Sequence, residues 1–155
     1  MERPSWAPVV LSGAVPREFS DLLAVTILLI ATAQAVLSKS VSLASAGPDW
    51  IFLLIVPVTC ALASLSNSGQ REREELALYA YGGSPRQIAM RYAIRGCIIA
   101  ALGTIPYFAY FLASGLSYPI DLTLLTTLVL FGGASYAASA TRRVHSTNFV
   151  GHYKG

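Results

Sequence analysis

Residues 71–96, "REREELALYAYGGSPRQIAMRYAIRG", lie between two apolar runs and determine how the rest of the chain is organised. This stretch carries five arginines and three glutamates, although charged residues make up only 12% of the 155-residue chain. The chain as a whole is 54% hydrophobic and has a mean hydropathy of +0.56, which is too apolar for an ordinary soluble fold of this length. We therefore interpret it as a membrane protein with one charged internal segment.

Four other segments carry almost no charge, and each approaches the roughly 20 apolar residues that a spanning helix needs. The shorter two could instead be core helices, but a soluble protein of this size could not bury all four, whereas lipid can cover them. The sequence predicts an all-α polytopic membrane protein with a single transmembrane domain over residues 1–155. Its four transmembrane helices are expected at about 20–42, 49–67, 96–116 and 119–140, with a cytoplasmic amphipathic segment at 70–95 between the second and third.

Basic residues fall almost entirely on one side of this arrangement. The first outer loop carries Lys39, whereas the termini and the central segment carry the other ten. Because cytoplasmic loops carry an excess of Lys and Arg, we expect a multi-pass cell-membrane protein with both termini cytoplasmic. The net charge of +3 belongs to this topological pattern, and no nucleic-acid partner is expected.

Polar residues in and beside the spans are few. Ser20 is expected to cap the first helix, with Asp21 in its first turn. Gln34 is expected to hydrogen-bond a neighbouring helix, with substrate contact as the alternative. No Asp, Glu, Lys or Arg is expected near a span centre, so the usual carriers of proton or ion coupling are absent. Pro106 is a candidate kink in the third span.

Small residues gather in the fourth span. Gly132, Gly133 and Ala137 include the small-xxx-small spacing at which helices approach closely. This spacing predicts a close helix contact, either within the monomer or between two copies.

The central segment predicts a helix, a break and a second helix. Residues 71–81 favour a helix, and Gly82 or Gly83 can end it in the left-handed conformation. Ser84, Pro85 and Gln87 then match a capping box that restarts the helix. The arginines that follow are expected in water or at lipid headgroups, namely Arg86, Arg91 and Arg95. From the residues alone, this unit is either a docking surface for a protein or a loop that sets topology and contacts anionic lipid.

The same stretch resembles the cytoplasmic segment of FtsX/MacB-type ABC permeases. The likeness rests on Arg73-Glu74, on residues 80–84 ("AYGGS") and on Leu102-Gly103. In that family the segment resembles a coupling helix that docks on a cytoplasmic ATPase and transmits its motion. The resemblance implies ATPase-coupling roles for Arg71, Arg73, Glu74, Glu75, Tyr79, Gly82, Gly83, Ser84, Pro85 and Arg86.

The chain departs from the family pattern in two respects. Family members usually hold a large extracytoplasmic domain between the first two helices, where this chain has only residues near 38–49. Tyr79 stands where a basic residue is common, and Glu75 where an aliphatic one is. The resemblance therefore implies a minimal four-helix permease.

The expected function follows from this resemblance. The chain would be a permease subunit that couples ATP hydrolysis by separate cytoplasmic ABC ATPase subunits to movement of a hydrophobic, lipid-like or peptide-like substrate. Its partners would be those ATPase subunits, a second permease copy or paralogue, membrane lipid and a separate extracytoplasmic subunit. The alternatives are an FtsX-like signalling regulator that does not transport, and a small structural subunit of another membrane complex.

The chain itself is expected to be non-catalytic. No glycine-rich loop precedes Lys39-Ser40 at phosphate-binding spacing, so ATP would be bound by the partner subunit and the chain would need no cofactor. No catalytic side-chain set and no metal-ligand cluster is apparent in the sequence.

Overall fold

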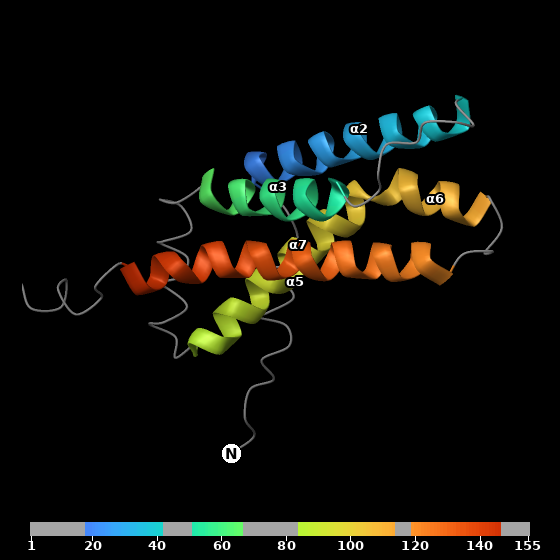
Figure 1. The fold of residues 1–155 in the computed structure, drawn as a ribbon. Coiled ribbons are helices and arrows are strands. Elements are labelled where there is room, and N and C mark those ends of the chain that lie inside the picture. The colour runs from blue at the N-terminus through green and yellow to red at the C-terminus, as the bar shows by residue number, and fades with distance from the viewer. Residues whose placement is uncertain (1–17, 42–50, 67–83, 114–118, 147–155) are drawn as a thin grey trace, which may run out of the picture.

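A computed structural model describes residues 18–41, 51–66, 84–113 and 119–146, and all regular structure within these ranges is helical. The elements are α2 (Phe19–Val41), α3 (Phe52–Ser66), α5 (Pro85–Gly103), α6 (Ile105–Ala113) and α7 (Pro119–Ser146). Successive legs run in opposite directions, with α5 and α6 forming one leg (Figure 1). The start of α2, the end of α3, the start of α5 and the end of α7 therefore lie at one end of the bundle.

Two helices are long and apolar enough to cross a membrane, over Phe19–Ser38 in α2 and Leu122–Thr141 in α7. The pair α5–α6 passes the same test as one bent span, which gives up to three. The apolar helix α3 has 15 described residues, or about 22 Å, whereas the hydrocarbon core is about 30 Å thick. The described chain is thus an all-helical protein with two to three candidate spans where the sequence predicted four.

The start of α5 confirms the predicted capping box. The Gln87 backbone N–H donates to Ser84 Oγ at 3.4 Å, and the Ser84 N–H donates to Gln87 Oε1 at 2.9 Å. Pro85 occupies the first helical position, where its missing N–H leaves no bond unmade. The helix then passes through the expected boundary at residues 95–96 and ends at Gly103. The amphipathic start and the beginning of the expected third span are therefore one rod.

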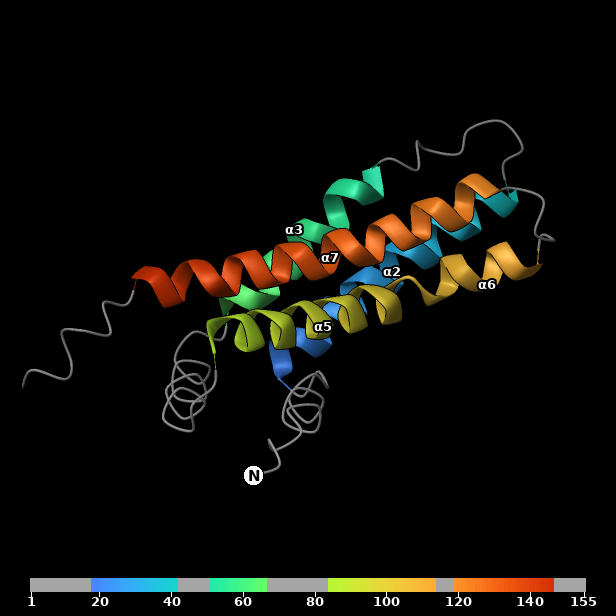
Figure 2. The same cartoon turned by 90° about the horizontal axis from the view of Figure 1, so that it is seen from below.

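A bend of 53° separates α5 from α6, where the sequence predicted a kink at Pro106, and Figure 2 shows α6 continuing from α5 beyond this bend. Pro106 is the second residue of α6 and offers no N–H to the carbonyl one turn earlier. The bend is held from α2, because Thr32 Oγ1 lies 2.9 Å from the Gly103 carbonyl oxygen. A Cβ on Gly103 would overlap Leu28, so only glycine permits this approach.

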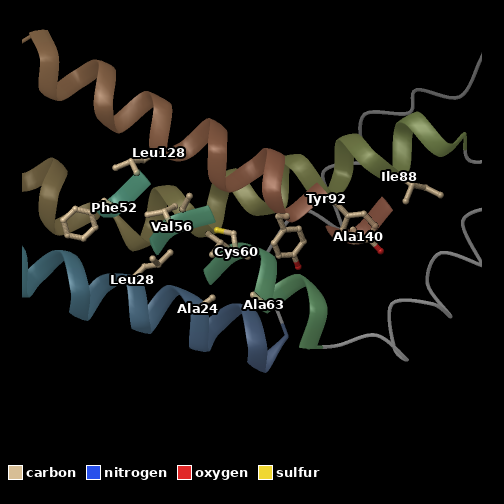
Figure 3. Close-up of a cluster of buried hydrophobic side chains, with 13 residues drawn as sticks. Ala24, Leu28, Phe52, Val56, Cys60, Ala63, Ile88, Tyr92, Leu128 and Ala140 are labelled. Atoms are coloured by element: carbon tan, nitrogen blue, oxygen red, sulfur yellow. The ribbon is translucent and has the colours of Figure 1, made fainter. Parts of the chain in front are cut away.

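The core lies where α2, α3, α5 and α7 meet (Figure 3). Its fully buried apolar residues include Leu28, Val56, Ile99 and Tyr136. Tyr107 of α6 is buried beside Phe52 of α3, with ring centroids 6.1 Å apart. The apolar side chains thus close the bundle along most of its length.

Glycines set the spacing between α5 and α7. A Cβ on Gly96 would lie 2.5 Å from Tyr136 Cβ, and one on Gly132 would lie 2.7 Å from Ala100 Cβ. Gly133 packs directly against Cys97. Ala137 is half-buried against the same core. Gly132, Gly133 and Ala137 of the expected fourth span therefore lie in a contact within the monomer.

Substitution of Gly96 by leucine should separate α5 from α7. The side chain would meet the Tyr136 Cβ and the backbone of Gly132 and Gly133, so it can be accommodated only by moving a helix. Overpacking of this kind costs about 3 kcal/mol, more than the roughly 1 kcal/mol that leucine gains over glycine in helix propensity. We expect a lower thermal unfolding midpoint in detergent for Gly96→Leu. The exposed position Ala101 on the same helix provides the control, because Ala101→Leu should leave the midpoint nearly unchanged; equal midpoints for both variants would contradict this packing.

Candidate functional site

A buried carboxylate joins three helices. Asp21, in the first turn of α2, is fully buried. Arg95 of α5 donates from Nε to Asp21 Oδ2 at 2.7 Å, and its Nη2 pairs with the same oxygen. The hydroxyl of Tyr136, on α7, donates to the other oxygen, Oδ1, at 2.9 Å. Both carboxylate oxygens are therefore occupied, each by a different helix. We call Asp21, Arg95, Tyr136 and Glu18 the ionic cluster.

Glu18 lies at the more exposed edge of the ionic cluster. Its Oε1 lies 3.1 Å from Arg95 Nη2, and its side chain is 12% exposed where that of Arg95 is 5% exposed. The Glu18 carbonyl accepts the Asp21 and Leu22 N–H groups at 3.1 Å each, which starts α2. Because a helix N-terminus carries partial positive charge, both carboxylates lie where that charge stabilises them.

The packing around the ionic cluster fixes the position of each member. Gly96, next to Arg95, lets α7 approach until Tyr136 reaches Asp21. The Tyr136 ring also packs on Tyr92, one turn earlier on α5, with centroids 6.2 Å apart. Removing a charge from water costs several kcal/mol, which only well-formed pairs and added hydrogen bonds can offset. Here the Arg95 guanidinium pairs with two carboxylates, and the buried Asp21 carboxylate accepts hydrogen bonds from donors on two other helices.

This site corrects two expectations from the sequence. Asp21 does lie in the first turn, but the helix begins at Phe19, so the prediction of Ser20 as N-cap is wrong. Arg95 is buried rather than in water or at headgroups, because Asp21 faces it from α2. Both charged residues lie inside the candidate spans, with Asp21 near the start of α2 and Arg95 in the first half of the α5–α6 pair.

A signal for this pairing was present in the sequence. An acidic and a basic residue at the edges of two apolar segments on the same side of the predicted topology should pair, because neither is stable alone in lipid. Tyr136 gave no such signal, since an apolar helix offers no local reason to distinguish it from a packing residue.

The residues predicted from the resemblance are only partly described. Ser84 and Arg86 are exposed at the start of α5, where Pro85 also lies. The predicted break at Gly82 and Gly83 lies outside the described residues, as do Arg71, Arg73, Glu74, Glu75 and Tyr79. Gln34 is exposed on α2, so no helix of the described bundle covers it.

Within the described ranges, no group of three His, Cys, Asp or Glu side chains is arranged to hold a metal ion. Comparisons with protein-family models, with curated proteins and with solved structures found no match. The chemistry of the site must therefore be argued from its own geometry. That geometry links α5 to α2 through the ion pair, and to α7 through the Tyr92–Tyr136 ring contact and the close approach at Gly96.

Loss of one partner of the ion pair should be far more harmful than loss of both. Asp21→Leu leaves the Arg95 guanidinium buried without its main partner, which should cost about 3–5 kcal/mol of stability. In the Asp21→Leu/Arg95→Met double variant no buried charge of the pair remains. Its loss of stability should therefore be smaller than the sum of the losses of Asp21→Leu alone and Arg95→Met alone. Thermal unfolding in detergent measures all three variants.

The exposed Arg86 on the same helix serves as the control, since Arg86→Met should change stability by less than about 0.5 kcal/mol. Additive losses in the double variant would show that Asp21 and Arg95 do not interact energetically.

Proposed function

We propose that this chain is the membrane-spanning permease subunit of an ABC-type complex. In this complex a separate cytoplasmic ATPase displaces the start of α5, and α5 transmits the displacement to α2 and α7. The chain contributes no catalytic group. It converts a movement at the membrane surface into a rearrangement of its helices.

The observation that carries this proposal is the continuity of α5. The helix has 19 residues, or about 28 Å, and runs without interruption from the exposed cap at Ser84 to Gly103. Its middle is attached to α2 by the Arg95–Asp21 pair and to α7 at Gly96. A push on the capped end therefore acts on both contacts together, as rigid elements do in shear and hinge transitions.

The resemblance supplies the source of the push. Residues 71–86 resemble the segment that docks on an ATPase in FtsX/MacB-type permeases, and their last two residues begin α5. The excess of basic residues in this segment and the termini favours a cytoplasmic location for all three. The helix ends that adjoin the central segment and the two termini in sequence are the start of α2, the end of α3, the start of α5 and the end of α7. Because the helix directions alternate, all four lie at one end of the bundle.

The exterior of the bundle favours a substrate that enters from lipid. Large hydrophobic side chains are exposed on α2, α3, α6 and α7, including Leu37, Leu62, Leu112 and Leu130. Such faces suit a hydrophobic, lipid-like or peptide-like molecule moving along or between two permease chains. The second copy or paralogue in the proposed complex follows from the resemblance to FtsX/MacB-type permeases.

Copurification with the tagged full-length chain tests this function. We expect the wild-type chain to retain an ABC ATPase from its native membrane, with ATP hydrolysis that depends on the assembled complex. Glu74→Arg should abolish the stimulation of ATP hydrolysis or the retention of the ATPase, because it reverses a charge at the proposed docking segment. Arg3→Glu makes a charge reversal outside that segment and should leave both unchanged.

Two results would overturn the proposal. Recovery of the wild-type chain without any ATPase would instead favour a structural subunit of another complex. Full ATP-stimulated activity of the assembled Glu74→Arg variant would show that this residue takes no part in coupling.

A further inference from the structure

One face of α2 is exposed along most of the helix. The residues on it follow each other at alternating spacings of four and three, and the four apolar ones are 46–62% exposed. We call this row the α2 seam; it consists of Leu23, Ile27, Ile30, Gln34 and Leu37. Alternation of four and three is the spacing of the a and d positions in helices that pair in a coiled coil. The opposite face of α2 packs on α3, α5 and α6.

Gln34 distinguishes this seam from a surface that only faces lipid. The exposed hydroxyls near it are satisfied within their own helix, since Thr26 donates to the Leu22 carbonyl at 2.8 Å and Ser38 to the Ala35 carbonyl at 2.8 Å. The Gln34 carboxamide makes no side-chain hydrogen bond within the described part of the chain. An amide left unbonded in hydrocarbon is costly, so lipid alone is an unsuitable neighbour.

A comparison with α3 sharpens this point. That helix also has an exposed row, Leu54, Val58 and Leu62, but every member is apolar. Lipid tails satisfy such a row completely, and it gives no reason to expect a protein neighbour. Of these two exposed rows, only the α2 seam combines helix-pairing spacing with a polar group that needs a partner.

We propose that the α2 seam binds the same seam of a second copy of this chain, with the two Gln34 carboxamides hydrogen-bonded to each other. Two copies with the same topology in one membrane are related by an axis along the membrane normal, so their α2 helices run parallel and identical positions meet. A carboxamide both donates and accepts, which makes Gln34 complementary to itself. The seam spacing puts Gln34 at an a position, where a single polar residue sets register and partner number.

The dimensions fit such a pair. From Leu23 to Leu37 the seam is about 21 Å long, within the roughly 30 Å of the hydrocarbon core. A repeat of 3.5 residues gives a left-handed crossing of about 20°, the commonest geometry of membrane helices. This inference requires only that α2 spans a membrane, and it does not depend on coupling to an ATPase.

Disulfide crosslinking of the full-length chain in its native membrane tests the contact. Ile27→Cys and Gln34→Cys should each give a dimer of this chain under mild oxidation. Val36→Cys is the matched control, because it is half-buried and lies about 200° around the helix from Gln34. The wild-type chain sets the background, since Cys60 is buried and Cys97 partly buried. Dimer yields for Gln34→Cys no higher than for Val36→Cys would overturn the proposal, as would crosslinks only to a different protein.

The role of the amide is measured separately by the dimerisation constant in detergent or lipid. Gln34→Leu should weaken dimerisation about 3- to 10-fold, the range of interhelical hydrogen bonds in membranes, while Gln34→Asn should retain more of the affinity. Both changes are at an exposed position, so circular dichroism should show an unchanged helical fold. Equal affinity of wild type and Gln34→Leu would overturn the amide pair. Because neither readout involves ATP, a negative result here leaves the proposed ATPase coupling to its own test.

Discussion

The ion pair between Asp21 and Arg95 is the constraint on which the arrangement of the helices depends. A buried charge must find its partner, so the pair fixes how α2 is rotated and how far it is shifted along α5. Two turns further along both helices, Leu28 meets Gly103. Thr32 then reaches the Gly103 carbonyl at the bend. The apolar contacts thus follow a register that electrostatics has already selected.

The two faces of α2 differ in their contacts. Its inner face holds the ionic cluster and the bend of α5, while its outer face carries the α2 seam. In the proposed complex, a displacement of α5 would therefore reach a neighbouring copy through α2, with no need for a contact between the α5 helices. In this arrangement α7 stabilises the positions of α3 and α5, because it packs extensively on both.

Features that depend on neighbouring residues could be predicted from the sequence. The capping box at Ser84 and the bend near Pro106 each follow from a few adjacent side chains, and apolar length revealed most of the helices. The ionic cluster could not be read in this way, because Asp21 and Arg95 are 74 residues apart and Tyr136 is 115 residues from Asp21. The exposure of Gln34 depends on which face of α2 the bundle covers, and that face follows from the same distant pair.

The burial of Arg95 also has a consequence for how the chain enters the membrane. A lone arginine opposes insertion of a spanning helix by up to about 2.5–3.5 kcal/mol, the cost at the helix centre. During synthesis α2 precedes α5, so Asp21 is already at the membrane when Arg95 arrives. Insertion of the third apolar segment then becomes cooperative with the first, and the chain acquires an order of assembly in which the earliest helix acts as a template for a later one.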